Sequence, residues 1–216
     1  MIRPVKQQDI SFMADIYNEY VVHGTATFEE VPLTEEEMSR RIIDISSRFP
    51  CLVCEIDERV VGYCYAHLWK GYGAYKHTLE TTVYLSPDYI GKGIGSLLMS
   101  ELVADCRRRG YKVLIACITG GNESSIALHR KLGFRKVSHF EKVGQKFGRW
   151  LDVEDYVVIG LLIPHLFSIA KKLPRKVVHR LSGTPASRFI RRRGCGTRCA
   201  QTVLFFSYFP LLSPAR

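Results

Sequence analysis

The sequence contains no apolar run that approaches the ~20 residues a membrane-spanning helix needs. It shows no secretory signal pattern, and its seven cysteines are an odd number. These features favour reduced thiols and a cytoplasmic location over a disulfide-stapled secreted fold. No group of cysteines and histidines has the spacing of metal ligands, so we expect no metal site.

Acidic residues are missing from one part of the chain. All 21 Asp and Glu residues lie in 1–161, whereas 162–216 contains 11 of the 31 Lys and Arg residues and five of the nine prolines. The basic excess therefore lies in 162–216, and a near-neutral 1–161 argues against a nucleic-acid-binding face there. We expect 162–216 to be a poorly ordered tail with no identified partner. A basic element that contacts RNA or anionic lipid is the alternative.

Apolar periodicity divides the rest into helices and strands. It predicts helices over 8–22, 35–48, 94–109 and 122–132, and strands over 2–6, 51–56, 60–68, 78–86, 112–118, 134–143 and 150–161. Thr34 and Glu37 form a capping box before the second helix. This order indicates one α/β domain over 1–161 with a mixed sheet. The C-x-x-C pair Cys51 and Cys54 lies in a strand, where we expect core cysteines.

Three alternating glycines follow the strand over 78–86, in the stretch "YIGKGIGSLLM" at 89–99. Gly91, Gly93 and Gly95 place no side chain in the path of an anion, and the unpaired N–H groups that open a helix attract one. Lys92 adds a positive charge at the rim. The Walker A pattern is absent, and Ser96 stands where a dinucleotide fingerprint needs its third glycine. A pyrophosphate on another carrier remains possible.

These motifs together resemble one family. The strand "TTVYLSP", the turn "GKGIG" and the later helix "NESSIALHRKLGF" are similar to the GNAT family of N-acetyltransferases, which bind acetyl-coenzyme A (acetyl-CoA) and acetylate amines. The stretches "IYNEYVVHGTATFEEVPLT", "KHTLETTVYLSP" and "VGQKFGRWLDV" resemble the subgroup that acetylates phosphinothricin, methionine sulfoximine and methionine sulfone. The resemblance covers about 2–161 and implies a mostly antiparallel mixed sheet flanked by helices.

The resemblance also implies which residues contact acetyl-CoA. The backbone of Gly91, Lys92, Gly93, Ile94, Gly95 and Ser96 would hold the pyrophosphate. Val83, Tyr84 and Leu85 would pair like a strand with the pantetheine arm, and Asn122 would hydrogen-bond the same arm. Ile90 stands where the family often has Gln or Arg, so backbone N–H groups would carry the binding there.

Two residues are implied as catalytic. Glu80 matches the general base of the subgroup, and its apolar strand would raise its pKa toward neutrality. An outward-facing strand glutamate is the alternative. His129 stands where many relatives have the tyrosine that protonates the leaving thiolate. An imidazolium there would serve as that acid, although an exposed helical histidine would look the same in sequence.

The acceptor's carboxylate needs donors, and its side chain needs an apolar wall. Lys76, His77, Lys146 and Arg149 lie in segments expected as loops near the site. The aromatic residues expected at the wall are Phe28, Trp69, Tyr75, Phe147 and Trp150, and Glu29 and Gly148 complete the subgroup-like stretches. A homodimer partner closing over "VGQKFGRW" would favour a small acceptor. Acetylation of a protein N-terminus or lysine, and acetyl-CoA binding without catalysis, are the alternatives.

Overall fold

The computed structural model describes residues 1–160, and the expectations for 161–216 lie outside that range. No helix in the described part is long and apolar enough to cross a membrane. In chain order the elements are β1 (Ile2–Pro4), η1 (Gln7–Asp9), α1 (Ile10–His23), α2 (Glu35–Arg48), β2 (Cys51–Ile56), β3 (Arg59–Leu68), η2 (Gly73–Tyr75), β4 (Thr78–Leu85), η3 (Pro87–Tyr89), α3 (Ile94–Arg108), β5 (Val113–Thr119), α4 (Glu123–Lys131), β6 (Arg135–Lys136), β7 (Phe140–Lys146) and β8 (Arg149–Ile159).

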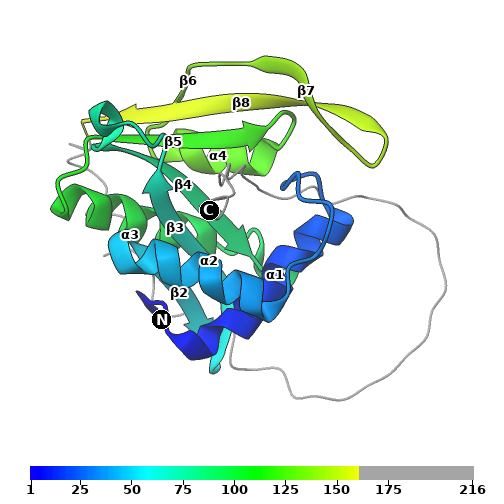
Figure 1. The fold of residues 1–216 in the computed structure, drawn as a ribbon, viewed down its shortest axis with the longest axis vertical. Coiled ribbons are helices and arrows are strands. Elements are labelled where there is room, and N and C mark those ends of the chain that lie inside the picture. Colours follow the sequence, from blue (N-terminus) through cyan, green and yellow to red (C-terminus); the bar gives the residue numbers. More distant parts are fainter. Residues whose placement is uncertain (161–216) are drawn as a thin grey trace, which may run out of the picture.

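The strands form one eight-stranded sheet in the order β1-β2-β3-β4-β5-β8-β6, with β7 also paired to β8 (Figure 1). β4 and β5 run parallel, and every other neighbouring pair is antiparallel. The expected mixed, mostly antiparallel sheet is confirmed. The parallel pair is joined through α3, as a parallel connection requires a crossover.

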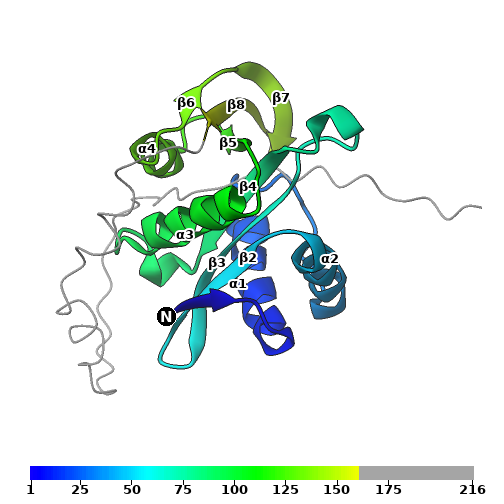
Figure 2. The same cartoon turned by 90° about the vertical axis from the view of Figure 1, so that its left-hand side faces the viewer.

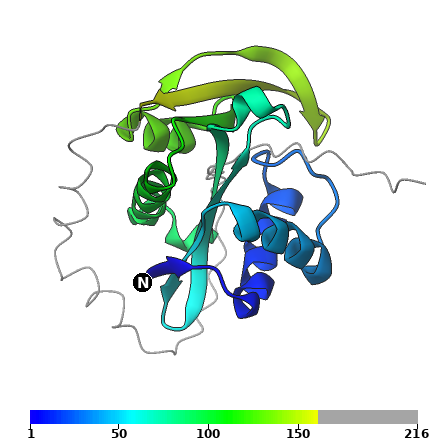
Figure 3. The same ribbon diagram turned by 60° about the vertical axis from the view of Figure 1, so that its left-hand side comes forward.

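Helices cover both faces of the sheet (Figures 2 and 3). On one face the ring of Tyr84 in β4 packs against Tyr17 and Tyr20 of α1, with ring centroids 5.1 and 5.7 Å away. On the other face the Cys64 thiol of β3 donates to the carbonyl of Leu98 in α3. Because side chains alternate along a strand, each strand contributes one set of residues to each layer.

The helix boundaries follow the signals in the sequence. The Thr34 hydroxyl accepts from the Glu37 N–H at 3.2 Å and the Glu37 carboxylate accepts from the Thr34 N–H at 2.8 Å, which confirms the capping box. Gly110 follows α3 with φ +86° and Gly133 follows α4 with φ +87°. Glycine adopts this left-handed conformation without steric cost, so both helices end where expected.

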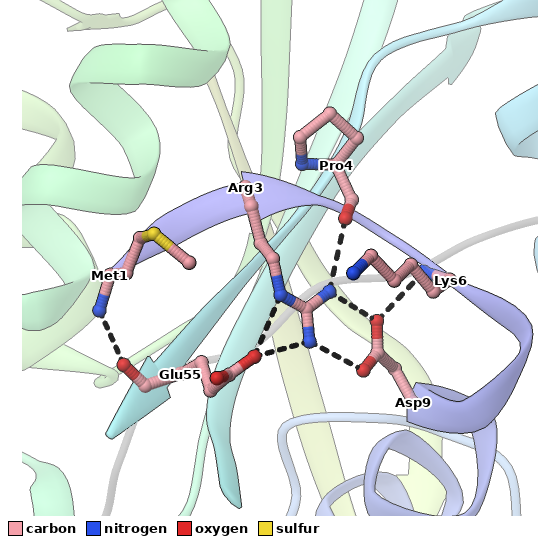
Figure 4. Close-up of polar contacts among 6 residues, drawn as sticks. All are labelled: Met1, Arg3, Pro4, Lys6, Asp9 and Glu55. Carbon is pink, nitrogen blue, oxygen red and sulfur yellow. Dashed lines mark hydrogen bonds and ion pairs between the residues drawn. The ribbon is translucent and has the colours of Figure 1, made fainter. Parts of the chain in front are cut away.

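A half-buried arginine fixes the N-terminal strand to the sheet (Figure 4). The Arg3 guanidinium donates to both oxygens of Asp9, at 2.7 and 2.8 Å, and to the Glu55 carboxylate of β2. The Asp9 carboxylate also accepts from the Lys6 N–H. Hydrogen bonds from Arg3 and Lys6 hold the pKa of Asp9 below its usual value, although burial opposes them. The cluster therefore joins β1, η1 and β2.

The structure differs from the sequence-based expectation after α4. The single strand expected over 134–143 is two strands, β6 and β7, and β7 continues to Lys146. The pairing of β7 with β8 shifts between Phe140 and Gly144, where Lys142 has φ +52°. Phe147 and Gly148, with φ +51° and +70°, then close a two-residue hairpin. A bulge inserts one extra residue into one strand, and that residue can be of any ordinary type. The apolar alternation of the sequence therefore does not reveal where the bulge lies.

Candidate active site

A gap opens in the middle of the sheet. β4 and β5 pair over only three residues each, from Thr78–Val113 to Glu80–Ile115. Both strands continue, to Leu85 and Thr119, but within residues 1–160 no further pairing joins them. On its opposite edge β4 stays paired with β3 as far as Leu85. The backbone of β4 beyond Glu80 therefore offers an edge to which an extended ligand can add.

The three residues expected to contact the cofactor arm lie along this edge. The side chains of Val83, Tyr84 and Leu85 are all buried. The Leu85 carbonyl also accepts a hydrogen bond from the Tyr20 hydroxyl. Because the side chains are packed in the core, these residues have only backbone groups to offer to a ligand, as the strand-like pairing requires.

The glycine turn opens α3 in the expected way. Gly91 and Gly93 have φ +76° and +82°, and a Cβ at either position would meet no atom within 4 Å. Gly93 is the N-cap of α3, no side chain caps that end, and the first bond inside the helix joins Leu97 N–H to the Gly93 carbonyl at 3.2 Å. The N–H groups of 94–96 are thus available to an anion.

The neighbours of the turn have different surroundings. Gly95 is packed, since a Cβ there would lie 3.4 Å from Leu128 and 3.5 Å from Leu85. The Lys92 ammonium lies 4.6 Å from the centre of the Tyr89 ring, where the ring face attracts a cation. Ile90 packs partly against the core. The turn itself therefore presents backbone rather than a polar side chain from Ile90.

Asn122 begins α4 and is nearly buried. Its Oδ1 accepts from the Ser125 N–H at 3.2 Å and from the Ser124 hydroxyl at 3.3 Å. This capping arrangement uses the carbonyl half of the amide and leaves the NH₂ group as a donor. The expected cofactor contact of Asn122 would use that NH₂ group.

A hollow of about 360 Å³ is lined by members of both expected residue sets, although not by Glu80 or Phe28. Its lining includes Ile90 and Asn122 of the cofactor set, and Phe147 and Arg149 of the acceptor set. This volume lies in the range of small-molecule sites, roughly 300–1,000 Å³. A second hollow, of about 410 Å³, lies against α1 and includes none of the expected residues.

Glu80 lies at the point where β4 and β5 separate. It is paired with His67 of β3 and Ile115 of β5, and its side chain is only 8 % exposed. Its Oε1 is buried and makes no hydrogen bond to any residue of 1–160. Burial raises the pKa of Glu80 to about 8, and the negative charge of Asp155 adds to this. Glu80 can thus exchange a proton near neutral pH, as a general base must.

The residues that share a face with Glu80 follow from the strand register. Cys117 of β5 pairs with Asp155 of β8, two residues along from Ile115, so Asp155 faces the same side as Glu80. The Ser138 hydroxyl donates to Asp155 Oδ2 at 2.8 Å and orients it. On the β3 side, burial lowers the pKa of His67. The face around Glu80 therefore contains a second carboxylate and a histidine that is neutral at pH 7.

His129 is fully buried within α4 rather than exposed. Its Nδ1 lies 2.8 Å from the Ser125 carbonyl, so Nδ1 carries the proton, and its ring packs edge-on against Phe134. Burial lowers the pKa of His129 to about 4. The imidazole is therefore neutral at pH 7, and the imidazolium expected from the sequence is not its resting form. Its role as the acid stays a prediction that this geometry disfavours.

The loop after α1 is tied to the rest of the domain. Thr119 at the end of β5 donates to the Thr25 carbonyl at 2.9 Å. Phe28 packs against Gly144 of β7 so closely that a Cβ there would lie 1.7 Å from Phe28 Cε2. The Glu29 carboxylate accepts from the Arg41 guanidinium of α2 at 2.7 Å. Phe28 and Glu29 are therefore held in fixed positions.

Lys146 does not lie in a loop, and its ammonium is buried. Its Nζ donates to the Tyr20 carbonyl at 3.2 Å and to the Thr27 carbonyl at 2.7 Å. Burial lowers the pKa of Lys146 to about 8. A direct bond to an acceptor carboxylate would require these contacts to break, so the geometry favours a role for Lys146 in bracing the hairpin against α1.

The other residues expected at the acceptor site are spread over two places. Tyr75 packs edge-on against Trp69 with ring centroids 5.1 Å apart, next to the exposed Lys76 and His77. Phe147 and Trp150 are 56 % and 61 % exposed on the hairpin. The structure brings Phe147 and Arg149 to the hollow and does not place the Tyr75 group there. Their contact with an acceptor stays a prediction.

Comparison with known proteins identifies the family. The family model described as "Acetyltransferase (GNAT) family" matches residues 13–134, more than half of the chain. The chain belongs to the GNAT family of acetyltransferases. Among curated GNAT relatives, a phosphinothricin N-acetyltransferase from Alcaligenes faecalis is 40 % identical over 153 residues, which cover 70 % of this chain and 78 % of that protein.

Two further GNAT proteins extend the comparison. An L-methionine sulfoximine/L-methionine sulfone acetyltransferase from Salmonella typhimurium is 35 % identical over 156 residues, 70 % of this chain and 90 % of that protein. A crystal structure of a phosphinothricin acetyltransferase from Sinorhizobium meliloti in complex with AcCoA aligns with a TM-score of 0.72 and 40 % identity, over 74 % of this chain and 87 % of that one. The expected family and fold are confirmed.

The GNAT fold also places residues that the sequence reading missed. Asp155 lies on the Glu80 face because of a register across three strands, which no local pattern reveals. Arg41 lies above the Tyr17 ring at 5.3 Å because α2 packs against α1. Thr82 follows Glu80 by two residues, and this strand spacing is a signal that could have been used.

Proposed function

We propose that this protein transfers the acetyl group of acetyl-CoA to the amino group of a small amino-acid-like acceptor of the phosphinothricin and methionine sulfone type. The observation that carries the proposal is Glu80. It is a buried carboxylate with its pKa raised to about 8, at the point where β4 and β5 separate. The names of the relatives at 35–40 % identity support the acceptor class.

The residues present fit acetyl-CoA. The unhindered turn at Gly91 and Gly93 would hold the pyrophosphate through the N–H groups that open α3. The open edge of β4 at 83–85 would pair with the pantetheine arm, and Asn122 would donate to it. Bound there, acetyl-CoA would supply the thioester, whose C–S bond breaks as the acceptor's N–C bond forms.

The residues of this chain contribute a general base, which removes a proton from the acceptor. An amino acid's ammonium group is protonated at neutral pH and has no lone pair to attack a carbonyl carbon. Glu80, when ionised, takes one proton from that ammonium and leaves a neutral amine. The surrounding apolar strand raises its pKa, so the carboxylate is a stronger base than in water.

The acceptor pocket is proposed to lie on the Glu80 face. Phe28 would supply an apolar wall, and the ion pair between Glu29 and Arg41 would close one side. Arg149, which lines the hollow, is proposed as a donor for the acceptor carboxylate. A site walled in this way would favour a free amino acid over the open groove that a protein terminus needs.

Two further features are part of the proposal. We propose a homodimer formed over the hairpin of β7 and β8, because Val143, Phe147 and Trp150 are exposed there. We also propose a cytoplasmic location, supported by Cys51, Cys54, Cys64 and Cys106, which are buried and form no disulfide within residues 1–160. Sedimentation of the wild type against Trp150→Asp would test the dimer, since a charged residue disfavours an apolar interface.

An acceptor panel tests the activity. Thiol release from acetyl-CoA would be measured with phosphinothricin, methionine sulfone, methionine sulfoximine and a peptide amine. We expect turnover with the small acceptors, and a loss of roughly 10²–10⁴-fold in kcat for Glu80→Gln. Glu154→Gln is the matched control, because Glu154 is also buried but pairs with Lys136. A panel without turnover, or an unaffected Glu80→Gln variant, would contradict the proposal.

A further inference from the structure

β4 contains two adjacent, fully buried threonines that differ in one respect. Thr81 and Thr82 are both 0 % exposed. The Thr81 hydroxyl donates to the Ile115 carbonyl of β5 at 3.1 Å. The Thr82 hydroxyl is buried and makes no hydrogen bond to any residue of 1–160.

An unpartnered buried hydroxyl is rare in folded proteins, because the group loses its hydrogen bonds to water and gains none in return. Such a group in a native structure calls for a reason, such as a ligand that supplies the missing partner. The neighbouring Thr81 shows that a threonine at this depth in β4 can find a backbone acceptor. The Thr82 side chain points to the opposite face of the sheet, and on that face its hydroxyl has no hydrogen-bond partner within 1–160.

That face is the one that carries Glu80. Residues two apart on a strand point to the same side, about 6.6 Å from one another along the strand. The register agrees, since Tyr65 and His67 of β3 lie opposite Thr82 and Glu80. Glu80 also has a buried oxygen, Oε1, without a partner in the described residues. Two adjacent side chains of one face thus both lack a hydrogen-bonding group that a ligand would provide.

The position of Glu80 and Thr82 along β4 indicates the chemical class of that ligand. β4 loses its β5 partner directly after Glu80, so Thr82 lies beside the gap. An ammonium has three N–H donors and fits two oxygen acceptors on one face. The backbone edge of β4, not this face, is what the cofactor arm would use.

We propose that Thr82 Oγ1 and Glu80 Oε1 together bind the amino group of the acceptor. The inference rests on the proposed function. The ammonium donates one hydrogen bond to each oxygen, and Glu80 then takes one proton and becomes a neutral carboxylic acid. Thr82 keeps its own proton and forms no covalent bond. It holds a remaining N–H and so limits the rotation of the amine, whose lone pair forms at the position of the proton that Glu80 takes.

Replacement of Thr82 by valine, which has nearly the same shape, gives a sharp test. We expect Thr82→Val to unfold at the same temperature as the wild type or higher, because it removes a buried hydroxyl without a partner. The variant should bind coenzyme A within twofold of the wild type. It should lose about 10–100-fold in kcat/KM for methionine sulfone and bind that acceptor correspondingly more weakly in calorimetry. Thr82→Ser should recover most of both.

Thr81→Val is the matched control. It removes a hydroxyl that has a partner, so its unfolding temperature should fall while its folded form keeps kcat/KM for methionine sulfone. The inference is overturned if Thr82→Val retains kcat/KM within twofold, if it is destabilised as much as Thr81→Val, or if it weakens coenzyme A binding instead. A wild type that acetylates no amine overturns the proposed function as well, whereas an active wild type with an indifferent Thr82→Val overturns the inference alone.

Discussion

The ammonium of Lys146 donates a 2.7 Å hydrogen bond to the Thr27 carbonyl, across 119 residues of sequence. A second bond, to Tyr20, reaches the last turn of α1. One side chain of β7 thus fixes both the end of a helix and the loop that carries Phe28.

Lys146→Met is therefore expected to destabilise the fold. It leaves two buried carbonyls without this donor, and one such loss costs about 1–3 kcal/mol. For a domain of this size the unfolding temperature should fall by several degrees, measured by calorimetry. Lys142→Met, an exposed residue of the same strand, is the control and should change little. An equal unfolding temperature for Lys146→Met would show that the brace is dispensable.

Cofactor affinity should depend on backbone rather than on the lysine of the glycine turn. Gly93→Val adds a branched side chain at φ +82° at the start of α3, so coenzyme A affinity should fall sharply. Lys92→Ala should have a small effect. Gly110→Ala imposes similar strain at φ +86° at the other end of α3, and should cost stability but not affinity. Calorimetric titration would check all three, and a larger effect of Lys92→Ala would contradict the backbone cradle.

The pKa of Glu80 has a consequence for stability. It is about 8 in the folded state against 4.5 for the free side chain, so between these values the folded state holds a proton that the unfolded state has lost. Stability then falls as pH rises through this window. Glu80→Gln has no such charge, so its unfolding temperature should exceed that of the wild type increasingly from pH 4.5 to 8. A constant difference across this range would argue against the raised pKa.

The pH dependence of activity should show the same pKa of Glu80, but activity should rise with pH over the range in which stability falls. kcat/KM should rise with pH to a midpoint near 8 as Glu80 ionises, and the midpoint should not follow the pKa of the acceptor amine. The nearest titratable groups on the Glu80 face of the sheet are His67 and Tyr65 of β3, Cys117 of β5 and Asp155 of β8. Tyr17 of α1 and Arg41 of α2 pack over the same face.

Among these, Asp155 supplies the negative charge that adds to the burial effect, so Asp155→Asn should move the midpoint to lower pH. Asp152→Asn, on the opposite face of β8, should not move it. An unmoved midpoint in Asp155→Asn would assign the whole shift to burial.

His129 should behave as a neutral core residue. Its pKa is about 4 in the folded state against 6.5 when free, so between these values only the unfolded state binds the proton. Stability should then fall as pH decreases from 6.5 toward 4, and His129→Gln should lack this part of the dependence. His23→Gln, at an exposed position, is the control. If a protonated His129 donated the proton to the leaving thiolate, kcat would decline as the pH rises above 4, because His129 loses its proton there.

The sequence predicts much of this molecule because its signals are local. Capping residues, glycines after helices and apolar alternation depend on a few neighbouring residues, and the capping box at Thr34 and the turn at Gly93 are found where they were expected. The glycine turn and Glu80 also belong to contiguous stretches that resemble one family.

What the sequence could not predict depends on contacts between distant segments. Lys146 reads as a polar loop residue, because its partners Tyr20 and Thr27 come from the other end of the domain. The burial of His129 depends on how α4 packs, and the short pairing of β4 with β5 is a matter of register. The strand spacing from Glu80 could have drawn attention to Thr82, but only the structure shows that its buried hydroxyl has no hydrogen-bond partner within 1–160.

The contact between Phe28 and Gly144 limits how this site can change. With a Cβ at 144 lying 1.7 Å from the Phe28 ring, any larger residue there forces the ring to move. A smaller residue at 28 would enlarge the proposed acceptor pocket and at the same time make room for a side chain at 144. Substitutions that alter the range of acceptors, natural or engineered, should therefore occur together at positions 28 and 144, which are 116 residues apart.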